Sequence, residues 1–199
     1  MNKIFIYGAS GHGLVVADIA FRNGYSDIIF VDDGDNEFPT FDDIKNKKHI
    51  PIAFGIGDNL TRAKLFDKVL SEGFMVKSLI HPTAIISQTS IIEMGTIVMP
   101  NVVINAKAKI GKGAILNTSC IVEHECQIGD FVHISPNVAL AGNVKIGSFT
   151  HIGIGSSIIQ SISIGSNCIV GAGSVVVSSI NNFYKAYGNP CKEIEKLKV

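Results

Sequence analysis

Two histidines and two carboxylates stand out in the stretch NTSCIVEHECQIGDFVHIS, which runs from Asn117 to Ser135. His124 lies between Glu123 and Glu125, and His133 follows in the same stretch. The residues around them are mostly small or aliphatic. Histidine titrates near pH ~6.5, so its imidazole can act as a general base close to neutral pH. Whether His124 does this depends on the scaffold that carries it.

The scaffold is a hexapeptide repeat. From Ile80 to Val176 every sixth residue is aliphatic, without a slip in register. The residue two places earlier is usually small, and Ile162 is the bulky exception. Hexapeptide repeats predict a β-helix in which three consecutive repeats form the three sides of each coil and the aliphatic column fills the axis. Three of the four cysteines occupy the small position, so we expect them in the core.

The period of three repeats predicts which residues stack on adjacent coils. His133 and His151 are separated by three full repeats and occupy equivalent places. His124 is equivalent to Ala106 and Gly142, so its neighbours on both sides lack bulk, and Gly142 leaves its backbone N–H accessible. A bare N–H can stabilise the oxyanion of an acyl-transfer intermediate. The spacing therefore predicts a general base at His124 and an oxyanion contact at Gly142.

The sequence leaves the partner of His124 open. In a straight strand, adjacent side chains point to opposite faces. Glu125 can therefore orient His124 only if the backbone bends there, or if a stacked coil or a neighbouring subunit brings the two together. The same restriction applies to Glu123.

Residues 1–79 lack the repeat and alternate between strand and helix patterns. We expect buried strands at KIFIY, DIIFV and IPIAF, helices at LVVADIAFRN and NLTRAKLFDKVLSE, and a polar loop over residues 34–49. This alternation implies a parallel sheet. The predicted fold class is an α/β Rossmann-like domain over residues 1–79, followed over residues 80–199 by an all-β parallel β-helix with a C-terminal tail.

A glycine turn, GASGHG, connects the first strand to the first helix. Glycines at a helix N-terminus let backbone N–H groups approach a phosphate. The GxxGxG spacing differs from the GxGxxG dinucleotide fingerprint, whereas Asp32 and Asp33 stand where a ribose-binding acid is expected. His12 favours a ligand contact, because a structural turn needs no imidazole. The pattern indicates nucleotide binding without hydride transfer from NAD, because a β-helix follows in place of a substrate domain.

Composition excludes several classes of function. The 199 residues carry 17 basic and 17 acidic side chains, and no basic patch typical of a nucleic-acid-binding protein is visible. Hydrophobic residues make up 46%, yet no apolar run approaches the ~18 residues of a membrane span. The first strand is too short for the apolar region of a signal peptide. We expect a cytoplasmic protein without membrane insertion and without disulfides.

A zinc site on the β-helix is a further possibility that the spacing disfavours. One class of carbonic anhydrases holds zinc on three histidines of a β-helix, with an HxxxxH pair. That pair is absent here, and the spacing of His124, His133 and His151 does not match it. We therefore expect no metal.

The repeats, together with ILNTSCIVEHEC, AGNVKIG and the terminal YGNPCK, resemble the left-handed β-helix acyltransferases. The preceding IYGASGHG and VDD segments narrow this resemblance to bacterial sugar acetyltransferases, in particular to UDP-4-amino-sugar N-acetyltransferases of the bacillosamine type. The resemblance covers nearly the whole chain and is weakest in residues 34–52 and 177–187. It implies left-handed coils and a homotrimer that binds acetyl-CoA between neighbouring β-helices.

The resemblance also implies roles for individual residues. His124 would take a proton from the C4 amine of a UDP-2-acetamido-4-amino-2,4,6-trideoxy sugar, and Glu125 would raise the basicity of His124. Acetyl-CoA would contact His133 and the backbone near Ile154 and Ala172. The family often has glycine at the position of Ala172. Neither a metal nor NAD is implied. The UDP-sugar would be held by Ser10, Gly11, His12, Asp32, Asp33 and Gly57.

Three alternatives stay open. An O-acetyltransferase of a sialic-acid-like sugar, or an N-acetyltransferase of a GDP-amino sugar, would keep the fold and change the acceptor. Nothing in GASGHG or the two aspartates distinguishes uracil from guanine. A non-catalytic nucleotide-sugar-binding scaffold would bind the nucleotide without consuming acetyl-CoA.

Overall fold

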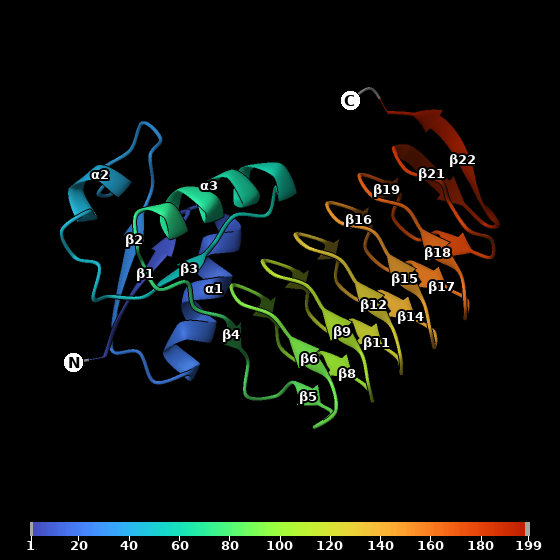
Figure 1. The fold of residues 1–199 in the computed structure, drawn as a ribbon, viewed down its shortest axis with the longest axis horizontal. Coiled ribbons are helices and arrows are strands. Elements are labelled where there is room, and N and C mark those ends of the chain that lie inside the picture. Colours follow the sequence, from blue (N-terminus) through green and yellow to red (C-terminus); the bar gives the residue numbers. More distant parts are fainter. Residues whose placement is uncertain (1, 198–199) are drawn as a thin grey trace.

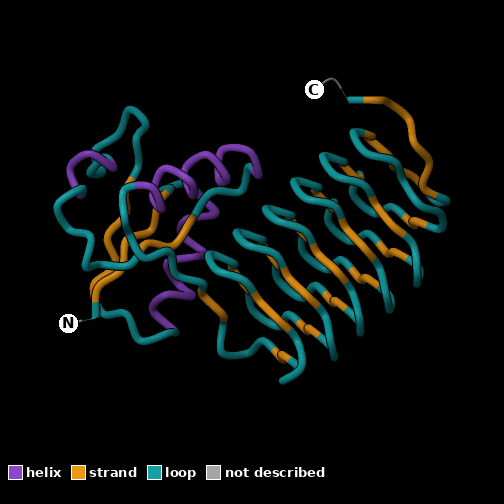
Figure 2. Tube along the Cα trace, in the orientation of Figure 1, coloured by secondary structure: helices purple, strands orange, loops and turns teal. Residues whose placement is uncertain are grey.

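The computed structural model describes residues 2–197 and shows an α/β unit followed by a three-sided coil of short parallel strands (Figures 1 and 2). The predicted fold class, an α/β unit before a left-handed β-helix, is confirmed. The predicted C-terminal tail ends with residues 198–199, which lie outside the described residues. None of the described helices is long and apolar enough to cross a membrane.

The α/β unit is built on a three-stranded parallel sheet in the order β2-β1-β3. The central strand is buried on both faces, with Ile4, Phe5 and Ile6 fully buried, as is usual when helices cover a parallel sheet. The three predicted strands and the two predicted helices are present. The elements are β1 (Lys3–Tyr7), α1 (Gly11–Arg22), β2 (Asp27–Val31), α2 (Phe41–Ile44), β3 (Ile52–Phe54) and α3 (Asn59–Ser71).

Two details of this unit differ from the sequence prediction. Helix α1 begins at Gly11, inside the glycine turn, and not at Leu14. This early start depends on Gly13, where an added Cβ would lie 2.0 Å from the carbonyl oxygen of Gly8. The predicted polar loop of residues 34–49 contains α2, whose two apolar residues are too few to show a helical period. A capping box from Thr40 starts this helix.

The β-helix has three faces, each a parallel sheet of strands from successive coils. An antiparallel hairpin, which the sequence did not predict, ends face 1. Face 1 contains β4 (Leu79–Ile80), β7 (Ile97–Val98), β10 (Ile115–Leu116), β13 (His133–Ile134), β16 (His151–Ile152), β19 (Ile169–Val170), β21 (Tyr184–Gly188) and β22 (Cys191–Lys196). Face 2 contains β5 (Ile85–Ile86), β8 (Val103–Ile104), β11 (Ile121–Val122), β14 (Ala139–Leu140), β17 (Ser157–Ile158) and β20 (Val175–Val176). Face 3 contains β6 (Ile91–Ile92), β9 (Lys109–Ile110), β12 (Gln127–Ile128), β15 (Lys145–Ile146) and β18 (Ser163–Ile164).

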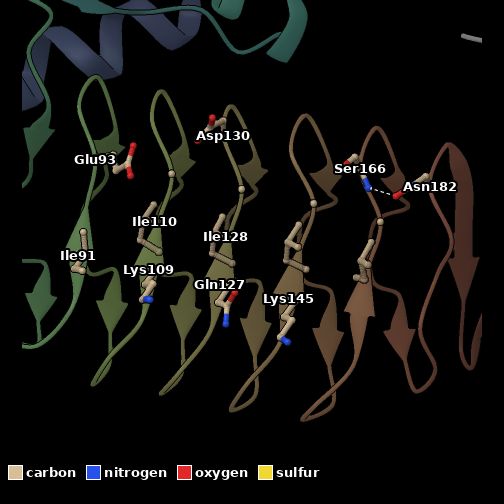
Figure 3. Close-up of a pocket in the computed structure, with 16 residues that line it drawn as sticks. Ile91, Glu93, Lys109, Ile110, Gln127, Ile128, Asp130, Lys145, Ser166 and Asn182 are labelled. Atoms are coloured by element: carbon tan, nitrogen blue, oxygen red, sulfur yellow. Dashed lines mark hydrogen bonds between the residues drawn. The ribbon is translucent and has the colours of Figure 1, made fainter.

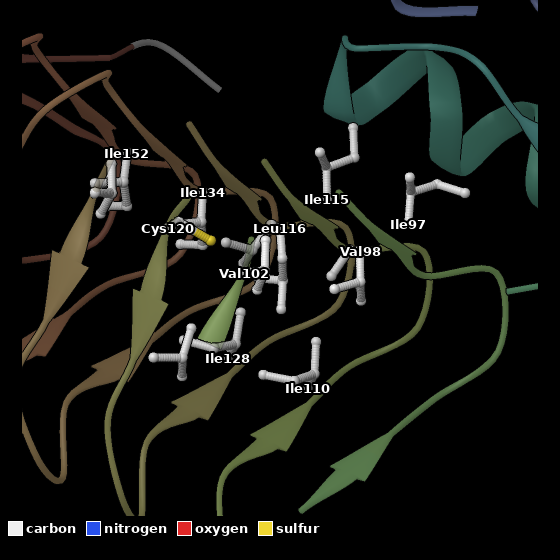
Figure 4. Close-up of a cluster of buried hydrophobic side chains, with 14 of the residues drawn as sticks. Ile97, Val98, Val102, Ile110, Ile115, Leu116, Cys120, Ile128, Ile134 and Ile152 are labelled. Atoms are coloured by element: carbon white, nitrogen blue, oxygen red, sulfur yellow. The ribbon is translucent and has the colours of Figure 1, made fainter. Parts of the chain in front are cut away.

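The predicted aliphatic column fills the axis of the coil. Strand partners on one face are separated by three full repeats, as in the pairing of His133 with His151. From Val98 to Val176, each sixth residue is at most 4% exposed. Figure 4 shows part of this column, with Val98, Leu116 and Ile134 inside the coil. The second residue of each two-residue strand therefore points inward and the first points outward.

From Gly95 onward, each corner as far as Gly173 turns through a residue with a left-handed backbone. These residues recur every six positions from Gly95 to Gly173, with φ between 54° and 71°. Most of them are not glycine, and asparagine is frequent because it tolerates this conformation better than other residues do. They include Lys107, Glu125 and Asn143, which share one corner.

The α/β unit packs on face 1, and a buried arginine joins the two parts. The Arg62 side chain, on α3, is fully buried. Burial lowers its pKa to about 10, so the guanidinium keeps its charge at neutral pH. It donates hydrogen bonds of 2.7–3.0 Å to oxygens on both sides of the junction. The acceptors are the carbonyls of Ile56, Gly57, Gly113 and Phe131 and the side-chain oxygen of Asn59.

We expect Arg62→Met to lower the free energy of unfolding by about 3 kcal/mol or more, because each buried acceptor left unpaired costs about 1–3 kcal/mol. Urea denaturation of both variants measures the effect. Lys64→Met is the matched control, since Lys64 is exposed on the same helix and its loss should change the free energy by less than about 0.5 kcal/mol. Equal effects of the two substitutions would contradict the junction role of Arg62.

Candidate active site

His124 lies at the corner between β11 on face 2 and β12 on face 3, and its side chain is 60% exposed. A Cβ added to Gly142 would lie 2.5 Å from both Cε1 and Nε2 of His124. The imidazole therefore lies directly against Gly142 of the next coil, as the period of three repeats predicts. Any side chain at position 142 would occupy the space of the ring.

The carboxylate of Glu125 meets the imidazole because the backbone bends at this residue. Glu125 is one of the left-handed corner residues, with φ at 62°. Its Oε2 lies 3.2 Å from Nδ1 of His124. A proton on Nδ1 then points to the carboxylate, and Nε2 is left with a free lone pair beside Gly142. Glu123 is engaged elsewhere, since its carboxylate accepts a bond from the backbone N–H of His124.

The backbone N–H of Gly142 is available beside that lone pair. Within residues 2–197, no acceptor pairs with it, whereas the neighbouring Asn143 N–H donates to the His124 carbonyl at 2.8 Å. A free N–H next to a basic nitrogen is the arrangement that acyl transfer needs, because the base takes a proton while the N–H stabilises an oxyanion.

A second candidate region lies at the carboxyl ends of β1, β2 and β3. This depression of about 520 Å³ is lined by four of the predicted nucleotide-binding residues: Ser10, Asp32, Asp33 and Gly57. Open α/β sheets bind ligands at this edge. Gly11 and His12 are predicted ligand residues that do not line it. Gly11 begins α1, and His12 turns toward the β-helix.

Asp32 holds the glycine turn in place. Its carboxylate accepts hydrogen bonds of 2.9 Å from the backbone N–H of Ala9 and from that of Gly34. These bonds, the one from Ala9 above all, lower the pKa of Asp32. The carboxylate is therefore ionised at the edge of the depression, where its contact with a nucleotide stays a prediction.

Asp33 connects α2 and α3 to the sheet edge. It accepts hydrogen bonds from the Tyr7 hydroxyl, from the backbone N–H of Phe41 and from Lys68. Partial burial raises the pKa of Asp33, but these bonds outweigh it and the pKa is lowered overall. Tyr7 and Lys68 could not be found from the sequence, because neither position carries a pattern that points to the aspartate.

A group of buried and half-buried histidines lies where the glycine turn meets face 1. His133 stacks on His151 with ring centroids 4.6 Å apart, and the His12 ring centroid lies 6.1 Å from that of His133. Burial lowers the pKa of His12 to about 4 and that of His133 to about 3, so both are neutral at pH 7. Nε2 of His12 is buried without a hydrogen-bond partner among the described residues.

The partners of His133 fix its tautomer. Nδ1 lies 3.3 Å from the carbonyl oxygen of Gly57, which can only accept, so Nδ1 carries the proton. Nε2 then accepts from the Asn117 amide at 3.1 Å. Sequence reasoning missed Asn117 and Arg62. The first could have been found from the coil register, while a buried arginine gives no signal because arginine is usually exposed.

The residues predicted to contact acetyl-CoA follow the corner between faces 1 and 2. Ile154 and Ala172 are exposed and occupy equivalent places on adjacent coils. The carbonyl of Ile154 accepts a bond from Gly173 N–H, which joins the two coils. His133 starts a face 1 strand that leads to the same corner, but only 9% of it is exposed. Contact of these residues with acetyl-CoA stays a prediction.

The two candidate regions lie on opposite sides of the β-helix. The glycine turn and Gly57 pack against face 1 through His133. His124 lies on the corner between faces 2 and 3, the one corner that face 1 does not share. One chain therefore holds a candidate base and a candidate nucleotide pocket that do not face each other. Within the described residues, no three His, Cys, Asp or Glu side chains gather to hold a metal.

Comparison with known proteins identifies the family. The PglD N-terminal domain family matches residues 3–69, and the bacterial transferase hexapeptide family matches residues 143–178. The acetyltransferase domain of PglB from Neisseria gonorrhoeae FA1090 is 35% identical, with a TM-score of 0.91 over 98% of this chain and 100% of that one. PerB from Caulobacter crescentus, solved with CoA and GDP-perosamine, is 33% identical, with a TM-score of 0.93 over 98% of both chains.

These similarities extend over nearly the whole chain, with both parts of the fold in the same order. The chain therefore belongs to the hexapeptide-repeat family of acetyl-CoA-dependent sugar N-acetyltransferases. WeeI from Acinetobacter baumannii AYE has the same architecture at 28% identity, with a TM-score of 0.91 over 96% of this chain and 100% of that one.

We expect Gly142→Ala to lower kcat by at least about tenfold with little loss of stability. The added methyl would take the place of the imidazole, and a general base contributes about 10²–10⁴ in rate. Because the His124 side chain is largely exposed, it can swing away without disturbing the core. Steady-state kinetics and thermal unfolding measure the two effects. Ala106→Gly, on the opposite side of His124, is the control and should retain kcat.

Proposed function

We propose that this chain transfers acetyl from acetyl-CoA to the C4 amine of a UDP-2-acetamido-4-amino-2,4,6-trideoxy sugar. The product is a UDP-diacetamido sugar of the bacillosamine type. The observation that carries the proposal is the arrangement at His124: Glu125 engages Nδ1, and Nε2 faces a glycine whose N–H has no partner within residues 2–197. The family supports acetyl-CoA as the donor.

The reaction follows from these groups. The amine nitrogen attacks the thioester carbonyl carbon, and an N–C bond forms while Nε2 of His124 takes a proton from the amine. The N–H of Gly142 stabilises the oxyanion. The C–S bond then breaks, and the CoA sulfur leaves with the proton that His124 returns. Glu125 stabilises the imidazolium between the two proton transfers, so no other acid or base is required.

The depression at Asp32 and Gly57 is the proposed site of the nucleotide. It lies at the sheet edge where α/β folds bind such ligands, and the glycine turn presents the start of α1 to it. His12 is proposed as a further contact for the nucleotide sugar; its Nε2 is buried without a hydrogen-bond partner among the described residues. Acetyl-CoA is proposed to follow the corner that carries Ile154 and Ala172.

A homotrimer would bring the two regions together, since His124 and the nucleotide depression of one chain lie on opposite sides of the coil. The outward column of face 2 supports such an assembly, because much of it is apolar. It presents Ile85, which is 67% exposed, and Ile121, which is 38% exposed, toward solvent. Burying this face between copies would place the His124 of one chain near the depression of another.

The identity of the nucleobase distinguishes the main proposal, a UDP-amino sugar as acceptor, from its nearest alternative, a GDP-amino sugar as acceptor. PerB was solved with GDP-perosamine. In this chain the depression has Asp32 and Asp33 at its edge, beside the apolar side chains of Ile56 and Leu65. We expect acetylation of the UDP-amino sugar, detected by mass spectrometry in a panel of nucleotide amino sugars, and tighter calorimetric binding of UDP than of GDP. Tighter binding of GDP would indicate that the acceptor is a GDP-amino sugar. Nucleotide binding without consumption of acetyl-CoA with any acceptor would indicate a non-catalytic scaffold.

We expect His124→Ala to lower kcat by about 10²–10⁴ while CoA still binds, because only base catalysis is removed. Turnover and calorimetric CoA binding measure the two effects. Crystal structures of two perosamine N-acetyltransferase variants, each with one histidine replaced, hold both CoA and GDP-perosamine. Turnover close to that of the unmodified protein would remove His124 from the mechanism.

His124→Ala, coexpressed with a second variant, also tests the assembly. Gly57→Phe should block the nucleotide depression without a clash, since an added Cβ at Gly57 meets nothing within 4 Å. Each variant alone should show strongly reduced turnover, whereas coexpression should raise turnover well above that of either variant because mixed trimers contain an intact site between two copies. Failure of the mixture to recover any turnover would contradict a site shared between chains.

A further inference from the structure

A small polar depression lies beside His124 on the face 3 side of its corner. It measures about 310 Å³ and is lined by Lys107, Lys109, Glu125, Gln127 and Asn143. Glu125, which contacts the imidazole of His124, therefore also forms a wall of this depression. A group bound in the depression would lie next to the candidate base.

The coil register explains why two lysines meet here. Lys107 is the left-handed corner residue of the coil before Glu125, so the two occupy equivalent places about one strand spacing, ~4.8 Å, apart. Lys109 is the outward residue of β9 and pairs with Gln127 of β12, which pairs with Lys145 of β15. Figure 3 shows Lys109, Gln127 and Lys145 projecting from the same side of their strands.

Both lysines are exposed, and their charges are not neutralised by a close ion pair. In the part of the chain that the structure describes, no carboxylate oxygen lies within 4.0 Å of either ammonium group. The other side of the corner differs, since the outward residues of face 2 nearest to His124 are Ile121 and Ala139. The two lysines therefore lie on the face 3 side of the base, in a depression that also carries the Glu125 carboxylate.

The site suits a diphosphate group. Lysine is a compact cation with three N–H donors and binds phosphate oxygens by charge-assisted hydrogen bonds. Both substrates of the proposed reaction carry a diphosphate, but at different distances from the reacting atoms. In a nucleotide sugar, a single sugar ring separates it from the C4 amine. In acetyl-CoA, the whole pantetheine arm separates it from the thioester. A diphosphate next to the base must therefore belong to the acceptor.

We propose that Lys107 and Lys109 bind the diphosphate of the nucleotide-sugar acceptor while His124 of the same chain takes the proton from its amine. This inference rests on the proposed function and deepens it. It assigns the face 3 side of the His124 corner to the acceptor. The acceptor is then bound at two points, its nucleotide and its diphosphate. Binding at both points orients the amine toward Nε2 of His124.

The test uses Lys107→Gln, Lys109→Gln, the double variant and the conservative Lys107→Arg. Lys77→Gln is the matched control, because Lys77 is also exposed, loses the same charge and lies outside both candidate regions. We expect each single Gln variant to raise the KM for the nucleotide sugar about five- to tenfold, as loss of a charge-assisted hydrogen bond does. The KM for acetyl-CoA and kcat should stay unchanged, and Lys107→Arg should retain most of the affinity.

Calorimetry with UDP, GDP and uridine separates this inference from the proposed function. Loss of the lysines should weaken binding of the diphosphates and leave uridine binding unaltered, whether or not acetyl transfer is detected. A rise in the KM for acetyl-CoA alone would assign the depression to the donor and overturn the proposal. Unchanged constants for all ligands in the double variant would overturn it as well.

Discussion

The structure depends on one constraint: each coil must return an aliphatic residue to the axis every six positions, and from Gly95 to Gly173 each corner turns through a left-handed residue. Because the coil closes after three repeats, each outward side chain has a fixed neighbour on the next coil. This arithmetic places His124 against Gly142 and places Lys107 beside Glu125. The same left-handed backbone that closes the corner turns the Glu125 carboxylate back to the imidazole. The candidate catalytic geometry thus needs no special loop, only polar residues at positions whose location the core already determines.

The histidines show how one scaffold gives the same side chain different properties. His124 is exposed at a corner, where its imidazole is open to solvent and to a ligand. His12 and His133 lie at the junction of α1 and face 1, where burial lowers their pKa values far below 6.5 and keeps both rings neutral. A neutral ring with a known tautomer can orient a neighbour or a ligand, but it is a poor base at pH 7. The environment therefore separates a candidate proton acceptor from candidate positioning groups.

Sequence reasoning could predict the β-helix, its register and the contact between His124 and Gly142, because all three follow from one unbroken period. It could not choose between Glu125 and Glu123, since a backbone bend is invisible to a rule about straight strands. It also missed α2, where two apolar residues give no helical period, and the hairpin of β21 and β22, where the hexapeptide pattern ends. The role of Arg62 could not be predicted from the sequence for another reason. Its burial is set by the packing of α3 on face 1, a long-range contact that no local pattern encodes.

That contact connects the β-helix to the candidate nucleotide depression. The loop between β3 and α3 carries Gly57, whose carbonyl accepts bonds from Arg62 and from His133. Arg62 also bonds to Gly113 and Phe131 of the β-helix, so the loop is held by groups from both parts of the chain. The α/β sheet alone would leave the Gly57 carbonyl without these partners, since His133 belongs to face 1 and Arg62 depends on face 1 for its burial. The shape of the candidate nucleotide depression is therefore linked to the docking of the two parts, which ties the α/β unit and the coil of hexapeptide repeats into one structure.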